Sequence, residues 1–411
     1  MKIRSITYFF HPDHPSRKEA LAQAGRFIRE ARAAVEASGY AVETVRLATP
    51  PFPIWLDEQD PAAARKLIRE FENQAAAAGF TYISLGPALP DSPESFTRIP
   101  GFLEAAPNTF FSGMMTTPGG GISLPAVRAC ARVIERAAAL TPDGFTNLRF
   151  TALANVQPGS PFFPAAYHSA DVQPAFALAT AAADLAVEAF TGAPTLQTAQ
   201  QRLREALEMH ARRLVEVAQR LEKAQKVHFY GIDFSLAPFP EEAQSLGTAL
   251  QRLGIEVVGM HGSLAAAALI ASTLDQANFP HTGFSGLRLP VLEDSTLARA
   301  AALGTLTVKD LLLYSAVCGT GLDTIPLPGD TTADQIAAVL LDVAALAQRL
   351  DKPLTARLMP VPGKLAGDPT EFEFAYFANS RVMPLEAAPL SGAFLGGDTI
   401  TLQPRKPGEN S

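Results

Sequence analysis

The chain has 411 residues, 47% hydrophobic and 18% charged, so it can bury a large core as two ordinary domains or as one large α/β barrel. Its formal net charge of −7 argues against nucleic acid as the main partner, because a phosphate backbone favours a basic surface. The sequence contains no run of about 20 apolar residues, so we expect no membrane span.

Strand-like and helix-like segments alternate along the chain. The charged and then apolar start predicts a first strand at residues 3–10 rather than a signal peptide. Further strands are expected at residues 40–47, 80–85, 109–115, 148–154, 227–233, 255–258, 322–327 and 354–360. Helices are expected at residues 15–38, 61–78, 124–140, 196–224, 241–253, 263–274, 308–317 and 332–350.

This alternation predicts a mostly parallel sheet with covering helices. About ten strands would suit either a closed barrel or a large open sheet. No linker or shift in composition divides the chain, so we expect a single α/β domain over residues 1–402 and a polar tail at residues 403–411. In either architecture ligands bind beyond the carboxyl ends of the strands, so polar residues that follow strands are the first candidates.

Three polar residues at such positions are candidate metal ligands or acid–base groups. Asp233 ends an apolar strand, His261 follows another, and His168 lies in a long loop. An aspartate there is more often a helix cap and a lone histidine more often structural, but the three together fit a catalytic centre. The turn His11-Pro-Asp-His14 has the residue types of a metal site, although its prolines fit a simple turn.

Glu293 and Asp294 are adjacent carboxylates. One interpretation is that they bind a divalent cation together with Asp233 and His261. The other is that they cap a helix beginning at Ser295, which is the commoner role for acidic residues in this position.

A triglycine, Gly119, Gly120 and Gly121, lies between a predicted strand and a predicted helix. Glycines let the backbone approach a ligand closely, and free amide groups at a helix start attract anions, so this is a candidate seat for a carboxylate or phosphate. The alternative is a tight turn. Arg357 and Lys364, which flank the turn after the last long strand, would suit the same anion.

Cys318 and Cys130 are the only cysteines, and they give neither a disulfide framework nor zinc spacing, so a cytoplasmic protein is expected. Glycines follow Cys318, and Asp323 comes shortly after. Cys318 is therefore a candidate nucleophile or acid–base group with Asp323 beside it, although buried inert cysteines are commoner. Ser285 lacks the spacing of a hydrolase nucleophile elbow and is taken as a substrate-binding candidate.

Several runs of residues resemble, in order and spacing, an uncharacterised prokaryotic family known as domain of unknown function 711. These runs are Arg4-Ser-Ile-Thr7, Gly119-Gly-Gly-Ile-Ser123, Pro161-Phe-Phe-Pro-Ala-Ala-Tyr-His168, Gly231-Ile-Asp-Phe-Ser-Leu-Ala-Pro238, Gly259-Met-His-Gly262, Phe284-Ser-Gly286, Pro290-Val-Leu-Glu-Asp294, Cys318-Gly-Thr-Gly-Leu-Asp323 and Thr355-Ala-Arg-Leu-Met-Pro360. The resemblance covers nearly the whole chain. It implies a ten-stranded α/β barrel like that of pyruvate formate-lyase and other glycyl-radical enzymes. The activity of the family is not established.

The resemblance does not extend to radical chemistry. Glycyl-radical enzymes carry a glycine in a loop near the carboxyl terminus, and the nearest match here, Arg381-Val-Met-Pro384, has a proline in its place. The shared barrel is therefore expected without the radical mechanism.

Two hypotheses of function follow. The first is a non-radical lyase, isomerase or hydrolase that acts on a small anionic metabolite in the barrel mouth, with a divalent metal as a candidate cofactor. In this hypothesis the anion is held by Gly119, Gly120, Gly121, Ser285, Arg357 and Lys364, and the chemistry is done by Asp233, His168, His261, Cys318 and Asp323. The alternative is a small-molecule sensor or binding protein on a catalytically inactive barrel. A weaker, structural hypothesis is that the polar positions are only caps and that alanine-rich helices pack subunits into a homodimer.

Overall fold

The computed structural model describes residues 1–12, 17–56, 60–169 and 173–404. In this part of the chain the main sheet has nine strands in the order β8-β7-β1-β2-β3-β4-β6-β10-β9. These strands are β1 (Lys2–Phe9), β2 (Val42–Ala48), β3 (Tyr82–Ala88), β4 (Thr109–Met114), β6 (Phe150–Ala154), β7 (Ala175–Ala181), β8 (His228–Asp233), β9 (Gly321–Pro328) and β10 (Leu354–Val361). Two short strands, β5 (Ile122–Ser123) and β11 (Thr399–Ile400), form a separate antiparallel ladder.

The strands of the main sheet run in two directions. The five central strands β1, β2, β3, β4 and β6 are parallel to one another. The outer pairs β7–β8 and β9–β10 are each internally parallel but antiparallel to the central strands beside them. The amino ends of the central strands therefore lie at the same edge as the carboxyl ends of β9 and β10.

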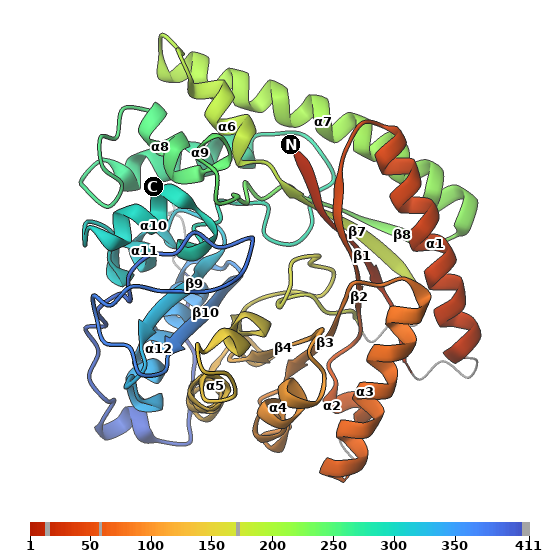
Figure 1. Cartoon of the computed structure of the whole chain (residues 1–411), viewed down its shortest axis with the longest axis vertical. Coiled ribbons are helices and arrows are strands. Elements are labelled where there is room, and N and C mark those ends of the chain that lie inside the picture. Colours follow the sequence, from red (N-terminus) through yellow and green to blue (C-terminus); the bar gives the residue numbers. More distant parts are fainter. Residues whose placement is uncertain (13–16, 57–59, 170–172, 405–411) are drawn as a thin grey trace, which may run out of the picture.

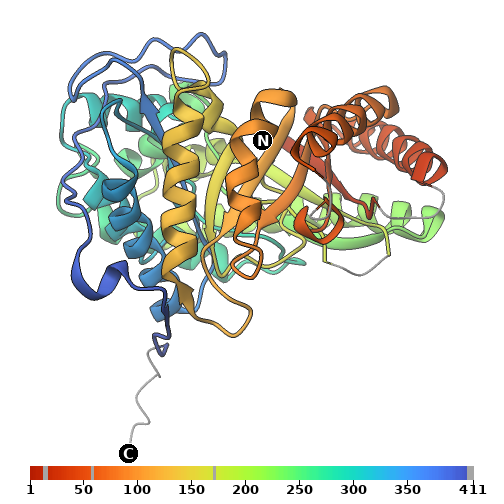
Figure 2. The same ribbon diagram turned by 90° about the horizontal axis from the view of Figure 1, so that it is seen from below.

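The described helices surround the sheet on its outer side (Figure 1). Twelve α-helices are α1 (Arg17–Ala37), α2 (Pro53–Leu56), α3 (Pro61–Ala78), α4 (Glu94–Ala105), α5 (Leu124–Ala138), α6 (Ala183–Phe190), α7 (Leu196–Gln225), α8 (Leu246–Arg252), α9 (Ser263–Asp275), α10 (Ser295–Ala302), α11 (Val308–Tyr314) and α12 (Ala333–Leu350). Neighbouring helices pack on one another, and Figure 2 shows α5 among the outer helices from a second side. None of the described helices is long and apolar enough to span a membrane.

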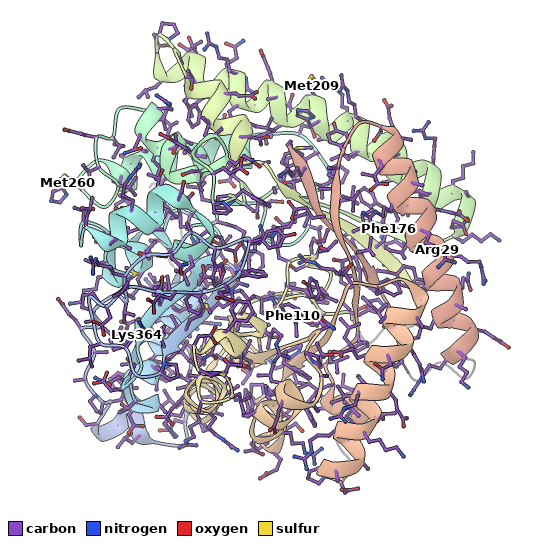
Figure 3. The ribbon with its side chains drawn as sticks, viewed as in Figure 1. Arg29, Phe110, Phe176, Met209, Met260 and Lys364 are labelled. Carbon is purple, nitrogen blue, oxygen red and sulfur yellow. The ribbon has the colours of Figure 1, made fainter. Side chains whose placement is uncertain are left out.

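Successive side chains of a strand pack on opposite faces of the sheet, one in an outer layer and the next in an inner layer. On β4, Phe111 points outward and packs on Phe52 and Phe102, with ring centroids 5.8 and 5.7 Å away, whereas Phe110 belongs to a smaller inner cluster. Figure 3 shows Phe110 near the middle of the molecule and Phe176 between the sheet and α1. The outer layer is the main hydrophobic core, and the inner face is left for polar contacts and cavities.

Two irregular segments lie against the inner face or the edges of the sheet. The hydroxyls of Thr7 and Ser84 donate to the carbonyl oxygens of Pro161 and Ala166, at 3.1 and 2.7 Å, so the loop after β6 runs across the inner face. The segment at residues 281–290 joins β8 at one end and β9 at the other, each through a single bridge. The mixed α/β fold expected from the sequence is thus confirmed, while the regular pairing defines nine strands and not a closed barrel of ten.

One expected strand is absent from the structure, and one strand of the main sheet was not expected. Residues 255–258 form a turn rather than a strand, because Gly254 and Gly259 on either side adopt positive φ angles of 103° and 100°. Strand β7 was not expected, because the run Ala175–Ala181 is mostly alanine and follows a proline-rich loop. The residues at 13–16 and 405–411, which include part of the histidine turn and most of the expected tail, lie outside the described part of the chain.

Candidate functional site

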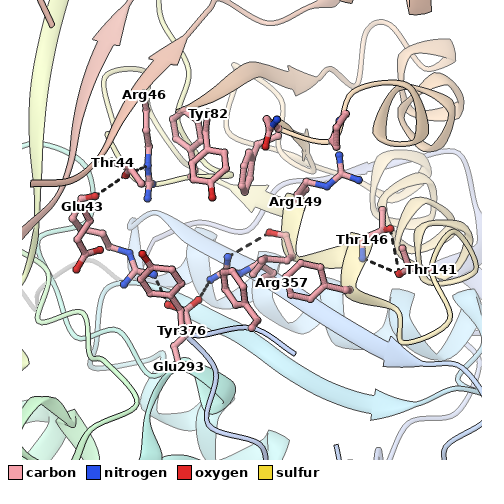
Figure 4. A pocket seen from close by; sticks show the side chains of 18 residues that line it. Glu43, Thr44, Arg46, Tyr82, Thr141, Thr146, Arg149, Glu293, Arg357 and Tyr376 are labelled. Atoms are coloured by element: carbon pink, nitrogen blue, oxygen red, sulfur yellow. Dashed lines mark hydrogen bonds and ion pairs between the residues drawn. The ribbon is translucent and has the colours of Figure 1, made fainter. Parts of the chain in front are cut away.

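A cavity of about 360 Å³ opens at the amino ends of the central strands (Figure 4). Its walls come from the first four strands, from the 3₁₀ turn η1 (Phe145–Arg149), from β10 and from the loop at residues 372–377. Four arginines, Arg4, Arg46, Arg149 and Arg357, line it together with two glutamates, Glu43 and Glu293. Their formal charges sum to +2, although the chain as a whole carries −7. The cavity therefore favours an anionic ligand.

One wall of the cavity is a chain of ion pairs. Arg4 donates to Glu293, whose other carboxylate oxygen accepts from Arg357 Nη2 at 2.7 Å. Arg357 Nε donates to Asp323 Oδ1 at 2.6 Å, and Arg288 Nη2 donates to Asp323 Oδ2 at 2.8 Å. These ion pairs connect β1, η3 (Val291–Glu293), β10 and β9 with the segment at residues 281–290, so they fix the guanidinium of Arg357 rigidly at the cavity wall.

Asp323 is ionised within this chain. Burial disfavours its charged form, but the guanidiniums of Arg357 and then Arg288 outweigh burial and hold the pKa of Asp323 at about 2. The same ion pairs raise the pKa of the Arg357 guanidinium against the opposing effect of burial. Both groups therefore keep their charges at neutral pH.

Arg46 differs from Arg357 because no acidic side chain of the described residues forms an ion pair with it, although the charges of Glu43 and Glu293 favour its protonated form. Its Nε donates to Thr44 Oγ1 at 2.9 Å and its guanidinium lies 5.0 Å from the centre of the Phe163 ring, but its terminal nitrogens make no hydrogen bond and no ion pair with the described residues. Burial, and then the positive charge of Arg4, lower the pKa of Arg46 to about 9. A buried cation of this kind is costly unless an anion joins it.

Arg149 is held differently. Its Nη1 donates to the carbonyl oxygen of Ala106 at 2.7 Å, and its Nη2 donates to that of Leu103 at 2.9 Å. These carbonyls belong to the carboxyl-terminal end of α4, where a cation is favoured by the helix dipole. Burial lowers the pKa of Arg149 to about 10, so it remains charged at neutral pH.

Glu43 is the acidic group of the cavity that has the fewest contacts. Its Oε1 is buried and has no hydrogen-bond partner among the described residues. Burial raises the pKa of the Glu43 carboxyl, and the nearby positive charges of Arg4 and Arg46 oppose this only in part. Burial thus favours the protonated form of Glu43 more than it does for a carboxyl group in water.

The structure brings some of the expected site residues together and separates the others. Arg357 and Glu293 line the cavity, and Asp323 lies directly behind Arg357. Lys364 is outside the cavity and pairs with Glu371 at 2.7 Å. Within the described part of the chain, the only expected site residues that approach the arginine-lined cavity are Arg357, Glu293 and Asp323.

Asp233 and Ser285 meet at a second, fully buried place. Asp233 accepts hydrogen bonds from the Ser235 hydroxyl at 2.6 Å and from the backbone amides of Phe284 and Ser285 at 2.8 and 2.9 Å. Burial raises the pKa of Asp233 even though these hydrogen bonds lower it. The contacts fix the segment at residues 281–290 to the end of β8, which is a structural arrangement.

The two predicted histidines are far from any shared site. His261 is exposed in a turn, whereas His168 is buried and its Nε2 lies 3.1 Å from the carbonyl oxygen of Gln173. Asp294 caps helices: it accepts from the Ser245 hydroxyl and from amides at the start of both α8 and α10. Among the described residues no three His, Cys, Asp or Glu side chains form a group that could hold a metal ion, so Asp233, His261, Glu293 and Asp294 are not assembled as ligands.

Gly119 and Gly120 line a different cavity, of about 690 Å³, at the carboxyl ends of β3, β4 and β6. Gly121 does not line this second cavity. Its amide donates to the Thr117 hydroxyl at 3.1 Å, so the triglycine folds back as a turn. Cys318 is buried, and its carbonyl oxygen accepts from the Lys352 ammonium group.

Arg4, Glu43, Arg46 and Arg149 were not expected from the sequence. Arg4, Glu43 and Arg46 lie near the starts of β1 and β2 or within them, and Arg149 ends η1 directly before β6, so the search for polar residues after strands does not reach them. The sequence nevertheless contained a signal. Arg4 in β1 and the pair Glu43 and Arg46 in β2 are charged residues within strands whose other residues are mostly uncharged.

The fold and the cavity together define the class of molecule: a mixed α/β protein whose sheet carries an arginine-lined cavity of small-molecule size. The chain belongs to the family described as Uncharacterised ACR (DUF711), which matches residues 1–378. It is 34% identical over 356 residues to a UPF0210 protein of Pyrobaculum arsenaticum, covering 80% of this chain and 76% of that relative. It is also 34% identical over 372 residues to a UPF0210 protein of Pyrobaculum aerophilum, with 83% and 79% covered. A UPF0210 protein of Oenococcus oeni is 27% identical over 391 residues, with 90% and 85% covered.

These comparisons confirm the family expected from the sequence motifs. The names of the relatives state no activity, so function has to be inferred from the site.

Proposed function

We propose that the arginine-lined cavity binds a small organic anion and is the active site of an acid–base enzyme. The observation that carries this proposal is Arg46, a buried guanidinium that faces the cavity without an acidic partner. A bound carboxylate or phosphate would supply the missing countercharge. Arg357 lines the same cavity as a second cation, and its ion pairs with Glu293 and Asp323 hold it in place.

The size and lining of the cavity support an organic ligand rather than a bare inorganic ion. A volume of about 360 Å³ lies within the range of small-molecule sites, roughly 300–1,000 Å³. Much of the lining is aromatic or aliphatic, which would receive the uncharged part of the ligand.

In this proposal Glu43 transfers the proton. Burial raises the pKa of the Glu43 carboxyl, and a carboxyl with a raised pKa is better suited to act as a general acid or base than one in water. The acid–base role expected for Asp233, His168 and His261 thereby moves to Glu43, and Asp323 becomes a residue that positions Arg357. A lyase, isomerase or hydrolase step remains the reaction class that we propose.

We also propose that the segment at residues 281–290 completes the sheet into a barrel of the pyruvate formate-lyase type. Its bridges to β8 and β9, the two edge strands, support this closure. A single domain, a homodimer and a cytoplasmic location remain further proposals.

A ligand screen tests the function. The purified full chain would be heated with each member of a panel of small carboxylates, phosphates and their neutral amide counterparts, and the melting temperature recorded. We expect anions to raise the melting temperature and neutral counterparts to leave it unchanged, because a ligand stabilises the state that binds it.

Mass spectrometry of the stabilising compounds then separates the two classes of function. Consumption of a stabilising compound by the wild type, but not by Glu43→Gln, would support the enzyme. Binding with no consumption would contradict the enzyme and favour a binding protein or sensor. No stabilisation by any anion would overturn the anion site itself.

A further inference from the structure

We infer that the ligand of the arginine-lined cavity is an aromatic carboxylate, whose ring lies between two aromatic walls and whose carboxylate meets Arg46. This inference rests on the proposed anion site and names the class of its substrate. It depends on how the aromatic side chains of the cavity are grouped.

The first wall consists of Tyr82, Phe110 and Phe163. The Tyr82 and Phe110 rings are 5.3 Å apart at an interplanar angle of 71°, and the Phe110 and Phe163 rings are 5.4 Å apart at 61°. Strands β3 and β4 place the first two rings, and the loop that crosses the inner face places the third. All three rings line the cavity, so the wall has ring edges and faces open to a ligand.

The second wall consists of Phe145, Phe374 and Tyr376. Phe374 lies 5.1 Å from Phe145 and 5.1 Å from Tyr376 between ring centroids. Phe145 comes from η1, and the other two come from the loop at residues 372–377. Both walls line the same cavity, and Figure 4 shows one ring of each, Tyr82 and Tyr376, among the residues of its lining.

The position of Arg46 would align the ring of a bound aromatic carboxylate between these walls. The guanidinium of Arg46 lies 5.0 Å from the Phe163 ring, at one end of the first wall. A carboxylate bound to Arg46 would leave the attached group beside Phe110 and Tyr82. A flat ring placed there would make edge-to-face contacts with these aromatic side chains, which a saturated ring of the same size cannot make.

Three probes of matched size test the inference on the full chain: benzoate, cyclohexanecarboxylate and benzamide. Isothermal titration calorimetry would give the dissociation constant of each. We expect benzoate to bind at least 10-fold more tightly than cyclohexanecarboxylate, and benzamide to bind at least 10-fold more weakly than benzoate.

Two variants locate the effect. Tyr376→Leu removes a half-buried ring of the second wall and should reduce the preference for benzoate over cyclohexanecarboxylate to less than 3-fold. Phe394→Leu, at a ring that is 47% exposed and does not line the cavity, is the matched control and should leave the preference unchanged. Circular dichroism would verify that both variants are folded.

The outcomes separate this inference from the proposed function. Equal binding of the two carboxylates, with benzamide excluded, would overturn the aromatic ligand and leave the anion site standing. Equal binding of benzoate and benzamide would overturn the anion site. Binding of none of the three probes by the folded wild type would overturn the aromatic ligand, and the anion site would then be judged by the wider panel.

Discussion

Replacing Arg46 by methionine should leave the free protein at least as stable as the wild type while removing its response to anions. Arg46 is 8% exposed and its pKa is lowered from 12.5 to about 9, chiefly by burial. Because one pKa unit corresponds to about 1.4 kcal/mol, holding this buried charge costs on the order of 5 kcal/mol. Methionine removes that cost but also removes the hydrogen bond to Thr44 and the contact with the Phe163 ring, which together contribute about 1–3 kcal/mol.

The expected net effect of Arg46→Met is a gain of about 2–4 kcal/mol in the free energy of unfolding at pH 7. For a chain of this length that corresponds to a rise of about 2–5 °C in melting temperature. Above pH 9 the wild type loses the proton of Arg46 in the folded state before the unfolded state does, so its stability rises with pH. The advantage of the variant should therefore shrink between pH 9 and pH 11.

Chemical denaturation at pH 7 and pH 10.5, with and without a stabilising carboxylate, measures both effects. Arg204→Met, at an exposed position on α7, is the matched control and should change neither stability nor the response to the ligand. A loss of 2 kcal/mol or more in free Arg46→Met, or an undiminished response to the carboxylate, would refute the view of Arg46 as an uncompensated anion receptor.

Three further predictions concern other groups. Asp294→Ala should lower the free energy of unfolding by about 2–4 kcal/mol, because this one carboxylate caps two helices. The control Asp60→Ala removes a single exposed cap on α3 and should cost about 1 kcal/mol. Equal losses for the two variants in urea titrations would contradict the double cap. Asp323→Asn should cost about 3–5 kcal/mol at pH 7, because it leaves the buried guanidinium of Arg288 without its acidic partner and Arg357 with Glu293 alone. Because the folded pKa of Asp323 is lowered to about 2, its contribution is present above about pH 4 and is lost as the pH falls through 2, so the deficit of Asp323→Asn should narrow in acid; a constant deficit would count against the assigned charge. Glu43→Gln should reduce turnover of any identified substrate 100-fold or more while its dissociation constant changes less than 10-fold, and unchanged turnover would exclude Glu43 as the proton-transfer group.

The fold could be predicted from the sequence to the extent that periodicity and turn residues determine it. The apolar runs of β1, β4 and β10 and the amphipathic helices α3 and α12 are visible in the sequence, because each buries one continuous face against the outer core. Strand β7 could not be predicted in the same way. Its alanines fill a narrow space beside β1, and that space is created by partners far away in the chain.

The candidate site was predicted only in part, because the direction of the strands decides where it lies. Arg357 and Asp323 belong to strands whose carboxyl ends meet the cavity, so a search after strands comes close to them. Arg46 and Glu43 belong to a central strand whose amino end meets the same cavity. The antiparallel pairing of β6 with β10 brings these two sets together, and no local pattern in the sequence reveals that pairing.

The ion-pair chain has a consequence for the order in which the protein assembles. Arg4 leaves the ribosome before its partner Glu293, which follows 289 residues later, and Arg357 follows later still. At a synthesis rate of about 5–20 residues per second, the first strand waits about 14 seconds or more for its acidic neighbour. The arginine-lined cavity therefore forms only after residues far apart in the chain have all been made, and recovery of ligand binding during refolding would report the assembly of these distant segments rather than of any one of them.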